Sequence, residues 1–181
     1  MQPNTTLSSG TKVVLSNLLY KIPQIETLKT LNALLAEESS SAKTLSNEAV
    51  GYLNGFLKEN GLQILLQVLN NRIESGRDPN DSHKLTFKVY DIAILYECIQ
   101  CCKSIAHDSV GINRFMALPK LISAIARCLN FQCKILSLSI IDLFDHCISQ
   151  SVQFATVVYG GIQVLIYFKL THPTYTHVYV V

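Results

Sequence analysis

The chain has 181 residues, of which 49% are hydrophobic and 15% charged, and its formal net charge is +2. This composition supplies enough apolar side chain for a full core, but no dense basic surface of the kind that nucleic-acid-binding proteins use. Six cysteines could indicate a disulfide framework. Because the N-terminus is polar and has no apolar signal segment, we expect reduced thiols in the cytosol instead.

The predicted elements are helices, because apolar side chains recur at helical spacing along most of the chain. Residues 1–10 are polar and expected to be disordered, and one helical domain is predicted over 11–168. Within it, helices are predicted over 24–36, 47–60, 61–71, 85–105, 112–116, 118–129, 134–148 and 152–159. The polar run EESSS (37–41) is expected to be a linker, and 72–84 an inserted loop. The apolar stretch 154–168 is too short and too rich in glycine to span a membrane.

One short sequence recurs along the chain. Gly61–Leu66 (GLQILL) returns as Gly161–Ile166 (GIQVLI), and Ala117–Ile122 (ALPKLI) is a degenerate copy between them. With 72–84 removed, the copies lie about 40–47 residues apart, the length of armadillo and HEAT repeats. Gly61 is expected to let the chain turn with a positive φ. We therefore predict an all-α, armadillo/HEAT-like right-handed helical solenoid, truncated at its C-terminal end before a non-helical tail (169–181); a plain helical bundle is the alternative fold.

The cysteines are candidates for metal ligands and for nucleophiles. Cys98 and Cys101 lie three residues apart within one predicted helix, and no second pair has that spacing, so buried core thiols are favoured over a zinc site. Cys101 or Cys102 with His107 could form a nucleophile and base, although a histidine at a helix C-terminus is also explained by the helix dipole. No glycine-rich phosphate loop or nucleophile elbow occurs. We expect neither enzyme activity nor a metal or cofactor.

The most informative segment is Cys98–Ile105 (CIQCCKSI), which is followed by Val110-Gly111-Ile112. It is similar to the C-[IL]-x-C-[LI]-K-A-[FIL] and [FY]-G-[IL] motifs of diaphanous-related formins. The Leu28-x-x-Leu31 helix after Ile22-Pro23 and the helix that begins at Gly61 also match. From Ile22 to about Ile148, the chain therefore resembles the N-terminal regulatory region of these formins, a GTPase-binding segment joined to an armadillo-type inhibitory domain.

The resemblance implies two partners and a site. The domain would bind a Rho-family GTPase in its GTP form and an amphipathic autoregulatory helix. Through these partners it would control actin cytoskeleton organisation, with actin affected indirectly. The protein would be cytoplasmic and associated with the cytoskeleton. The family's switch-binding surface would lie near 36–41. Carried over position by position, the residues facing the helix would be Lys103, His107, Ile140, Ile141 and Phe144. The alternative is a general armadillo or HEAT adaptor that binds an unrelated peptide or protein.

Overall fold

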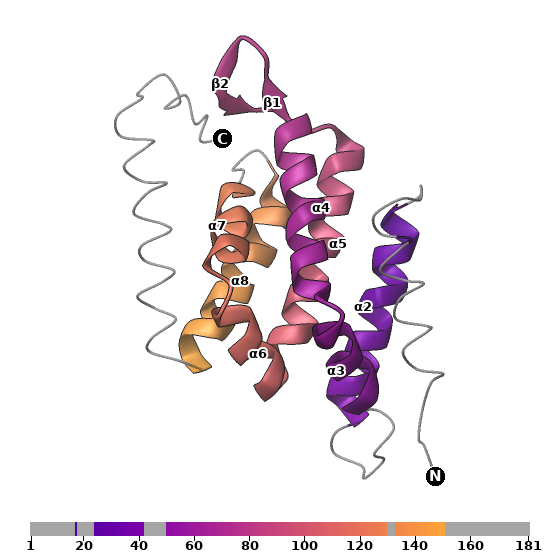
Figure 1. Cartoon of the computed structure of the whole chain (residues 1–181). Coiled ribbons are helices and arrows are strands. Elements are labelled where there is room, and N and C mark those ends of the chain that lie inside the picture. Colours follow the sequence, from indigo (N-terminus) through magenta and orange to yellow (C-terminus); the bar gives the residue numbers. More distant parts are fainter. Residues whose placement is uncertain (1–16, 18–23, 42–49, 130–132, 151–181) are drawn as a thin grey trace.

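The computed structural model describes residue 17 and residues 24–41, 50–129 and 133–150 (Figure 1). Its helices are α2 (Gln24–Ser41), α3 (Val50–Lys58), α4 (Gly61–Ser75), α5 (Val89–Ala106), α6 (Ser109–Met116), α7 (Pro119–Arg127) and α8 (Lys134–Gln150). A hairpin of β1 (Arg77–Asp78) and β2 (Asp81–Leu85) joins α4 to α5. The predictions for 1–10, for 169–181 and for the third sequence copy, Gly161–Ile166, lie outside the described residues.

The helices form two similar three-helix units. Each unit has a short helix (α3 or α6), then a helix that begins with a copy of the repeated sequence (α4 or α7), then a long third helix (α5 or α8). Helix α5 packs between α2 and α8, and α4 packs against α7, so that long helices lie side by side in two layers (Figure 1). Because neither unit could bury its apolar faces alone, the units depend on each other. This arrangement confirms the predicted all-α helical solenoid.

The core runs continuously through both layers and is centred on α5. Ile94, Cys98, Ile99 and Cys102 of that helix are fully buried, and they contribute to one hydrophobic cluster that takes residues from every described helix. A helix with neighbours on both sides must be apolar over most of its circumference. Helix α5 meets this requirement, and it therefore positions α2 and α8 relative to each other.

The start of α4 corrects one expectation about Gly61. No described glycine has a positive φ, and the left-handed residue at this turn is Asn60, with φ 60° and ψ 32°. Gly61 is instead the first residue of α4, and a Cβ there would overlap the ring of Phe56, which is fully buried. Asparagine tolerates the left-handed conformation better than most residues, and glycine supplies the close approach between α3 and α4.

Two predicted non-helical segments, 37–41 and 72–84, differ in the structure. The expected linker at 37–41 is helical, because α2 continues to Ser41; alanine and glutamate favour helix, and they outweigh the serines that follow. The expected loop at 72–84 begins later, since α4 continues to Ser75 and the residues after it form the β1–β2 hairpin. Ile73 is fully buried, so one more helical turn buries apolar area that a loop would expose.

The junction between α5 and α6 is closely packed. The carboxylate of Asp108 caps α6 by accepting hydrogen bonds from the backbone N–H groups of Val110 (2.8 Å) and Gly111 (3.0 Å). Gly111 lies so close to α5 that a Cβ would overlap the backbone carbonyl oxygen of Ile105. The glycine of the Val110-Gly111-Ile112 motif therefore has a packing role, because it lets α6 turn back against the end of α5.

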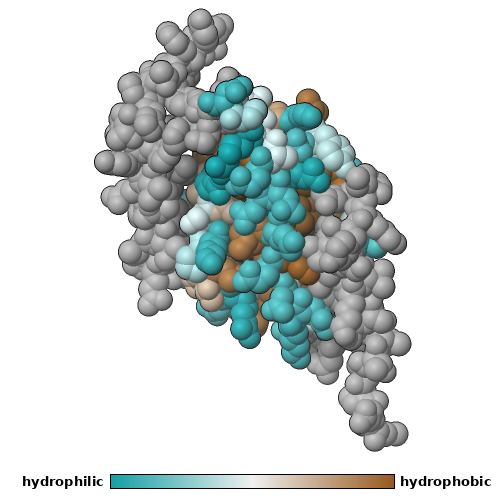
Figure 2. Space-filling model, turned by 45° about the horizontal axis from the view of Figure 1, so that its top comes forward, coloured by the Kyte–Doolittle hydropathy of each residue, from teal (hydrophilic) through white to brown (hydrophobic). Residues whose placement is uncertain are grey.

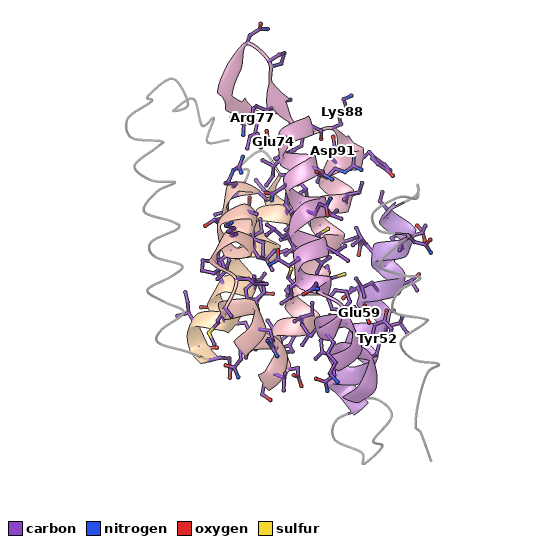
Figure 3. All side chains as sticks on the ribbon, in the orientation of Figure 1. Tyr52, Glu59, Glu74, Arg77, Lys88 and Asp91 are labelled. Carbon is purple, nitrogen blue, oxygen red and sulfur yellow. The ribbon has the colours of Figure 1, made fainter. Side chains whose placement is uncertain are left out.

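The hairpin end of the molecule carries several ion pairs. Arg77 Nη2 lies 2.9 Å from Glu74 Oε1 (Figure 3). Arg72 Nη1 lies 3.3 Å from Asp91 Oδ1, where α4 and α5 meet. Elsewhere the surface is mixed, and Figure 2 shows a side on which hydrophilic side chains surround smaller hydrophobic patches. None of the described helices is long and apolar enough to cross a membrane.

Candidate protein-binding face

Helix α2 and the third helices of the two units, α5 and α8, form a continuous side of the molecule, which we call the α2–α5–α8 face. Two polar contacts join α5 to α2: Cys101 Sγ lies 3.5 Å from the carbonyl oxygen of Leu28, and Ser104 Oγ donates to Asn32 Oδ1 at 2.8 Å. Residue numbers rise together along both helices, so α2 and α5 run parallel. The repeat thus presents equivalent helices side by side, as a binding surface of a helical array requires.

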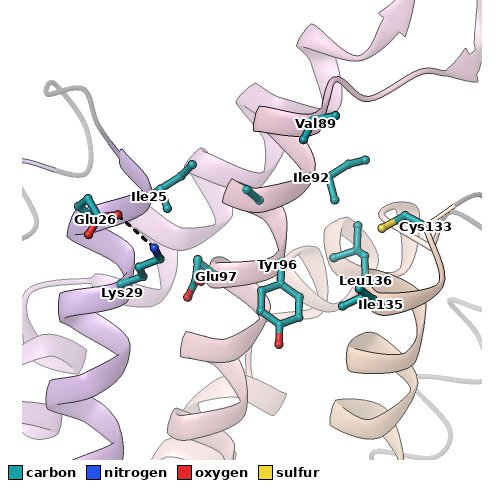
Figure 4. Close-up of a pocket in the computed structure, with 11 residues that line it drawn as sticks. Ile25, Glu26, Lys29, Val89, Ile92, Tyr96, Glu97, Cys133, Ile135 and Leu136 are labelled. Carbon is teal, nitrogen blue, oxygen red and sulfur yellow. Dashed lines mark hydrogen bonds and ion pairs between the residues drawn. The ribbon is translucent and has the colours of Figure 1, made fainter.

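A pocket of about 540 Å³ opens on this face near the first turns of the three helices (Figure 4). Most of its lining is apolar, and a partner's hydrophobic side chain would be largely desolvated there. Its lining residues are Ile25, Glu26, Lys29, Val89, Ile92, Ala93, Tyr96, Glu97, Cys133, Ile135 and Leu136.

The charged groups of the pocket lie on α2 and α5. Lys29 Nζ forms an ion pair with Glu26 Oε1 at 3.1 Å (Figure 4). Partial burial raises the pKa of the Glu97 carboxyl group, while the positive charge of Lys29 opposes this rise. The pocket is therefore an apolar site with acidic and basic groups along one side, which suits an amphipathic partner.

Three contacts, which we call the polar ladder, join the C-terminal halves of α5 and α8. Gln100 Nε2 donates to Ser139 Oγ at 3.1 Å. Lys103 Nζ forms an ion pair with Asp142 Oδ2. The rings of His107 and His146 have centroids 4.2 Å apart. Both helices contribute residues at positions i, i+3 and i+7, and the numbers rise together, so α5 and α8 are parallel and held in one register.

The charges of the polar ladder follow from these contacts. The hydrogen bond and the positive charge of Lys103 lower the pKa of the Asp142 carboxyl group, so it is a carboxylate at neutral pH. Burial, followed by the proximity of His146 and Lys103, lowers the pKa of His107, although Asp142 opposes this. His107 is consequently neutral at pH 7. His146 Nε2 also lies 3.2 Å from the carbonyl oxygen of Ala106 at the end of α5.

The structure separates the predicted site residues into two groups. Lys103 and His107 lie on the α2–α5–α8 face, and Ile141 of α8 is 53% exposed. Ile140 and Phe144 were predicted to face a partner, but their exposed fractions are 0% and 4%, which places both in the core. Helix α8 is apolar on both sides, and the side carrying these two residues packs inward, with Leu136, Leu143 and Cys147.

Several residues of the face were missed from the sequence. Ile135 and Leu138 are exposed by 68% and 64%, which is unusual for large aliphatic side chains. Tyr96 in the pocket and His146 in the polar ladder were also missed. A helical projection of 134–150 would have separated the apolar residues of α8 into two stripes. Only the packing of α5 identifies which stripe is exposed.

The cysteines are free thiols, and five of the six are buried. Burial raises the pKa of Cys98 and Cys101 well above the ordinary value, and that of Cys128 and Cys147 to about 12. Cys102, the candidate partner of His107, also has a raised pKa because it is buried. A protonated, enclosed thiol is a poor nucleophile. Among the residues that the structure describes, no group of three or more His, Cys, Asp or Glu side chains could hold a metal ion.

Comparison with protein families shows the family of this chain. The family model described as Diaphanous GTPase-binding Domain matches residues 16–146. The chain belongs to this family. The match includes Lys103, His107 and Ile141 of the face and confirms the resemblance to the N-terminal region of diaphanous-related formins. The diaphanous domain of this chain is thus a GTPase-binding regulatory domain of the formin type. The chain matches no curated protein and no solved structure.

Proposed function

We propose that this diaphanous domain binds a Rho-family GTPase in its GTP form and an amphipathic autoregulatory helix on the α2–α5–α8 face. Through them it would control actin cytoskeleton organisation as a non-catalytic, cytoskeleton-associated regulator that affects actin indirectly. The observation that carries the helix-binding half is the apolar pocket of about 540 Å³ beside the polar ladder, with its ion pair of Lys103 and Asp142. The family match over residues 16–146 supports the GTPase half.

An amphipathic helix suits the face because the pocket and the polar ladder lie next to each other. Apolar side chains of the helix would enter the space beside Ile92, Tyr96 and Ile135, where removing them from water is favourable. Its polar side chains would meet the ion pair of Lys103 and Asp142. Because this pair is already formed, the partner need not order either side chain, and the entropic cost of binding is reduced.

Ile135→Asp tests the helix-binding half. The residue lines the pocket and is 68% exposed, so the fold should tolerate the change, whereas a partner would bury the new carboxylate against apolar atoms. We expect binding of a C-terminal autoregulatory helix from a diaphanous-related formin to weaken by about tenfold or more, measured by fluorescence anisotropy.

Val110→Asp is the matched control, because Val110 is 47% exposed on α6, away from the pocket. It should leave the affinity for the helix unchanged. Equal weakening by both substitutions, or none by Ile135→Asp, would contradict the assignment of the pocket.

The GTPase half makes a separate prediction. A Rho-family protein should be retained by the immobilised diaphanous domain when loaded with a GTP analogue and not when loaded with GDP. Equal retention of both forms, or retention of neither, would contradict it while leaving the helix-binding result standing.

The general adaptor function is kept as a second candidate because of one observation at the polar ladder. The resembled family commonly has asparagine at the position of His107, whereas this imidazole packs at a tilt of 55° against the ring of His146. An imidazole pair presents a different surface from an amide, so the partner could be an unrelated peptide. Failure of the formin helix to bind the unaltered protein, together with binding of another peptide at Ile135, would favour this candidate.

A further inference from the structure

Two histidines form the last step of the polar ladder, and we call them the histidine pair. His107 is the C-cap of α5 and is exposed, and His146 lies near the C-terminal end of α8. Their ring centroids are 4.2 Å apart. Histidine is the side chain whose charge ordinarily changes near physiological pH. The pair therefore places two titratable groups in contact on the face that is proposed to bind a helix.

Among the described residues, the charged groups close to the histidine pair come from three elements. Lys103 of α5 and Asp142 of α8 form an ion pair one turn away. Asp108, at the start of α6, accepts hydrogen bonds from two backbone N–H groups of that helix. Helix α2 meets the other side of α5 through uncharged groups, the Leu28 carbonyl and the Asn32 amide. Both carboxylates thus already have donors, so a proton on the pair adds positive charge that they offset only in part.

A carboxylate supplied by a partner would favour the protonated pair. In the free chain, burial and then the proximity of His146 and Lys103 lower the pKa of His107, so protonation is unfavourable. A carboxylate bound beside the pair would attract the added positive charge and raise that pKa. Because the partner then favours uptake of the proton, the proton must favour binding of the partner by the same free energy.

We propose that the histidine pair makes helix binding to the α2–α5–α8 face depend on pH. The partner is an amphipathic helix that places an aspartate or glutamate over the pair. At about pH 7.5 this carboxylate meets a polar ladder in which Lys103 and Asp142 cancel, and at about pH 6 it meets net positive charge. The face therefore binds such a helix more tightly in mildly acidic solution. This inference rests on the proposed function, since it concerns the regulation of the same site, and it adds the sign of the partner's charge.

The affinity at two pH values tests this regulation. Binding of the C-terminal autoregulatory helix from a diaphanous-related formin to the full chain is measured by fluorescence anisotropy at about pH 6.0 and about pH 7.5. The affinity should be about threefold or more higher at the lower pH, as expected for one proton whose pKa rises by about one unit on binding. The same peptide with every Asp and Glu replaced by Asn or Gln should lose this increase, because it offers the pair no carboxylate.

Substitution of the histidines separates the pair from other titratable groups. The pKa of Glu97 in the pocket is also raised, and its contribution remains when the histidines are removed. His107→Gln and His146→Gln should each reduce the increase in affinity at the lower pH, and the double variant should lose it. His83→Gln, in β2 of the hairpin, is the matched control and should keep the full increase. Circular dichroism at both pH values verifies that each variant is folded.

The outcomes separate this regulation from the proposed function. An affinity that does not rise at the lower pH would overturn the role of the histidine pair, and so would an increase that the double variant or the amide peptide keeps. Both results would leave the helix-binding half of the proposed function standing. A peptide that binds at neither pH would instead contradict helix binding itself, and the regulation with it.

Discussion

Gly111→Ala tests whether the close contact between α5 and α6 determines the packing of the second unit. The new methyl group would overlap the backbone carbonyl oxygen of Ile105, which cannot rotate away as a side chain could. Helix α6 must therefore move, and this movement would also lengthen the 3.0 Å hydrogen bond from the Gly111 N–H to Asp108. Relative to glycine, alanine favours a helix by only about 1 kcal/mol.

The steric overlap at residue 111 and the helix propensity of alanine act in opposite directions and differ in size. Overpacking costs about 1–3 kcal/mol, and weakening the capping hydrogen bond costs about 1 kcal/mol more. After subtraction of the helix propensity, we expect Gly111→Ala to lower the free energy of unfolding by about 2 kcal/mol. Urea denaturation followed by circular dichroism measures this. Ser123→Ala, at an exposed position in α7, should be neutral or slightly stabilising. A Gly111→Ala protein as stable as the unaltered chain would refute the steric explanation.

Three further predictions concern charge and reactivity. Because the pKa of His107 is lower in the folded state, the unfolded chain binds more protons below about pH 6.5, and the free energy of unfolding should fall as the pH decreases through that value. His107→Gln should make the free energy of unfolding less dependent on pH in this range. An unchanged dependence would contradict the pKa shift. Iodoacetamide should modify the partly exposed Cys133 of the folded protein first and the five buried thiols only after unfolding, which mass spectrometry would show. Rapid modification of a buried thiol in the folded protein would contradict its burial and raised pKa. Asp91→Ala should lower the free energy of unfolding by about 1–3 kcal/mol in urea denaturation, because it removes the partner of Arg72; no loss would mean that this ion pair is not stabilising.

The sequence predicted the repeat better than it predicted the ends of the helices. The copy at Gly61 starts α4, and the copy at Ala117 begins two residues before α7 (Pro119–Arg127), so both mark the second helix of a unit. The apolar spacing that defines these helices is local, so it can be recognised without knowledge of the packing. The continuation of α4 beyond Asn71 depends on the burial of Ile73, which is a tertiary contact and has no local sequence pattern.

The binding residues show the same limit more clearly. Lys103, His107 and Ile141 were carried over from the resemblance to the family, and all three lie on the α2–α5–α8 face. Ile140 and Phe144 could not be separated from Ile141 by hydrophobicity, because α8 has an apolar stripe on each side. Which stripe faces the core is decided by the packing of α8 against α5, where Gln100 and Ser139 form a hydrogen bond across the two helices.

The affinity of the domain for a Rho-family GTPase in its two nucleotide states tests the central claim most directly. Isothermal titration calorimetry of the full chain with the same GTPase, loaded once with a GTP analogue and once with GDP, gives both dissociation constants. We expect binding in the GTP state and affinity at least about tenfold weaker in the GDP state, a difference of about 1.4 kcal/mol. Equal affinities, or no binding in the GTP state, would contradict the assignment of this chain as a GTPase-responsive regulatory domain.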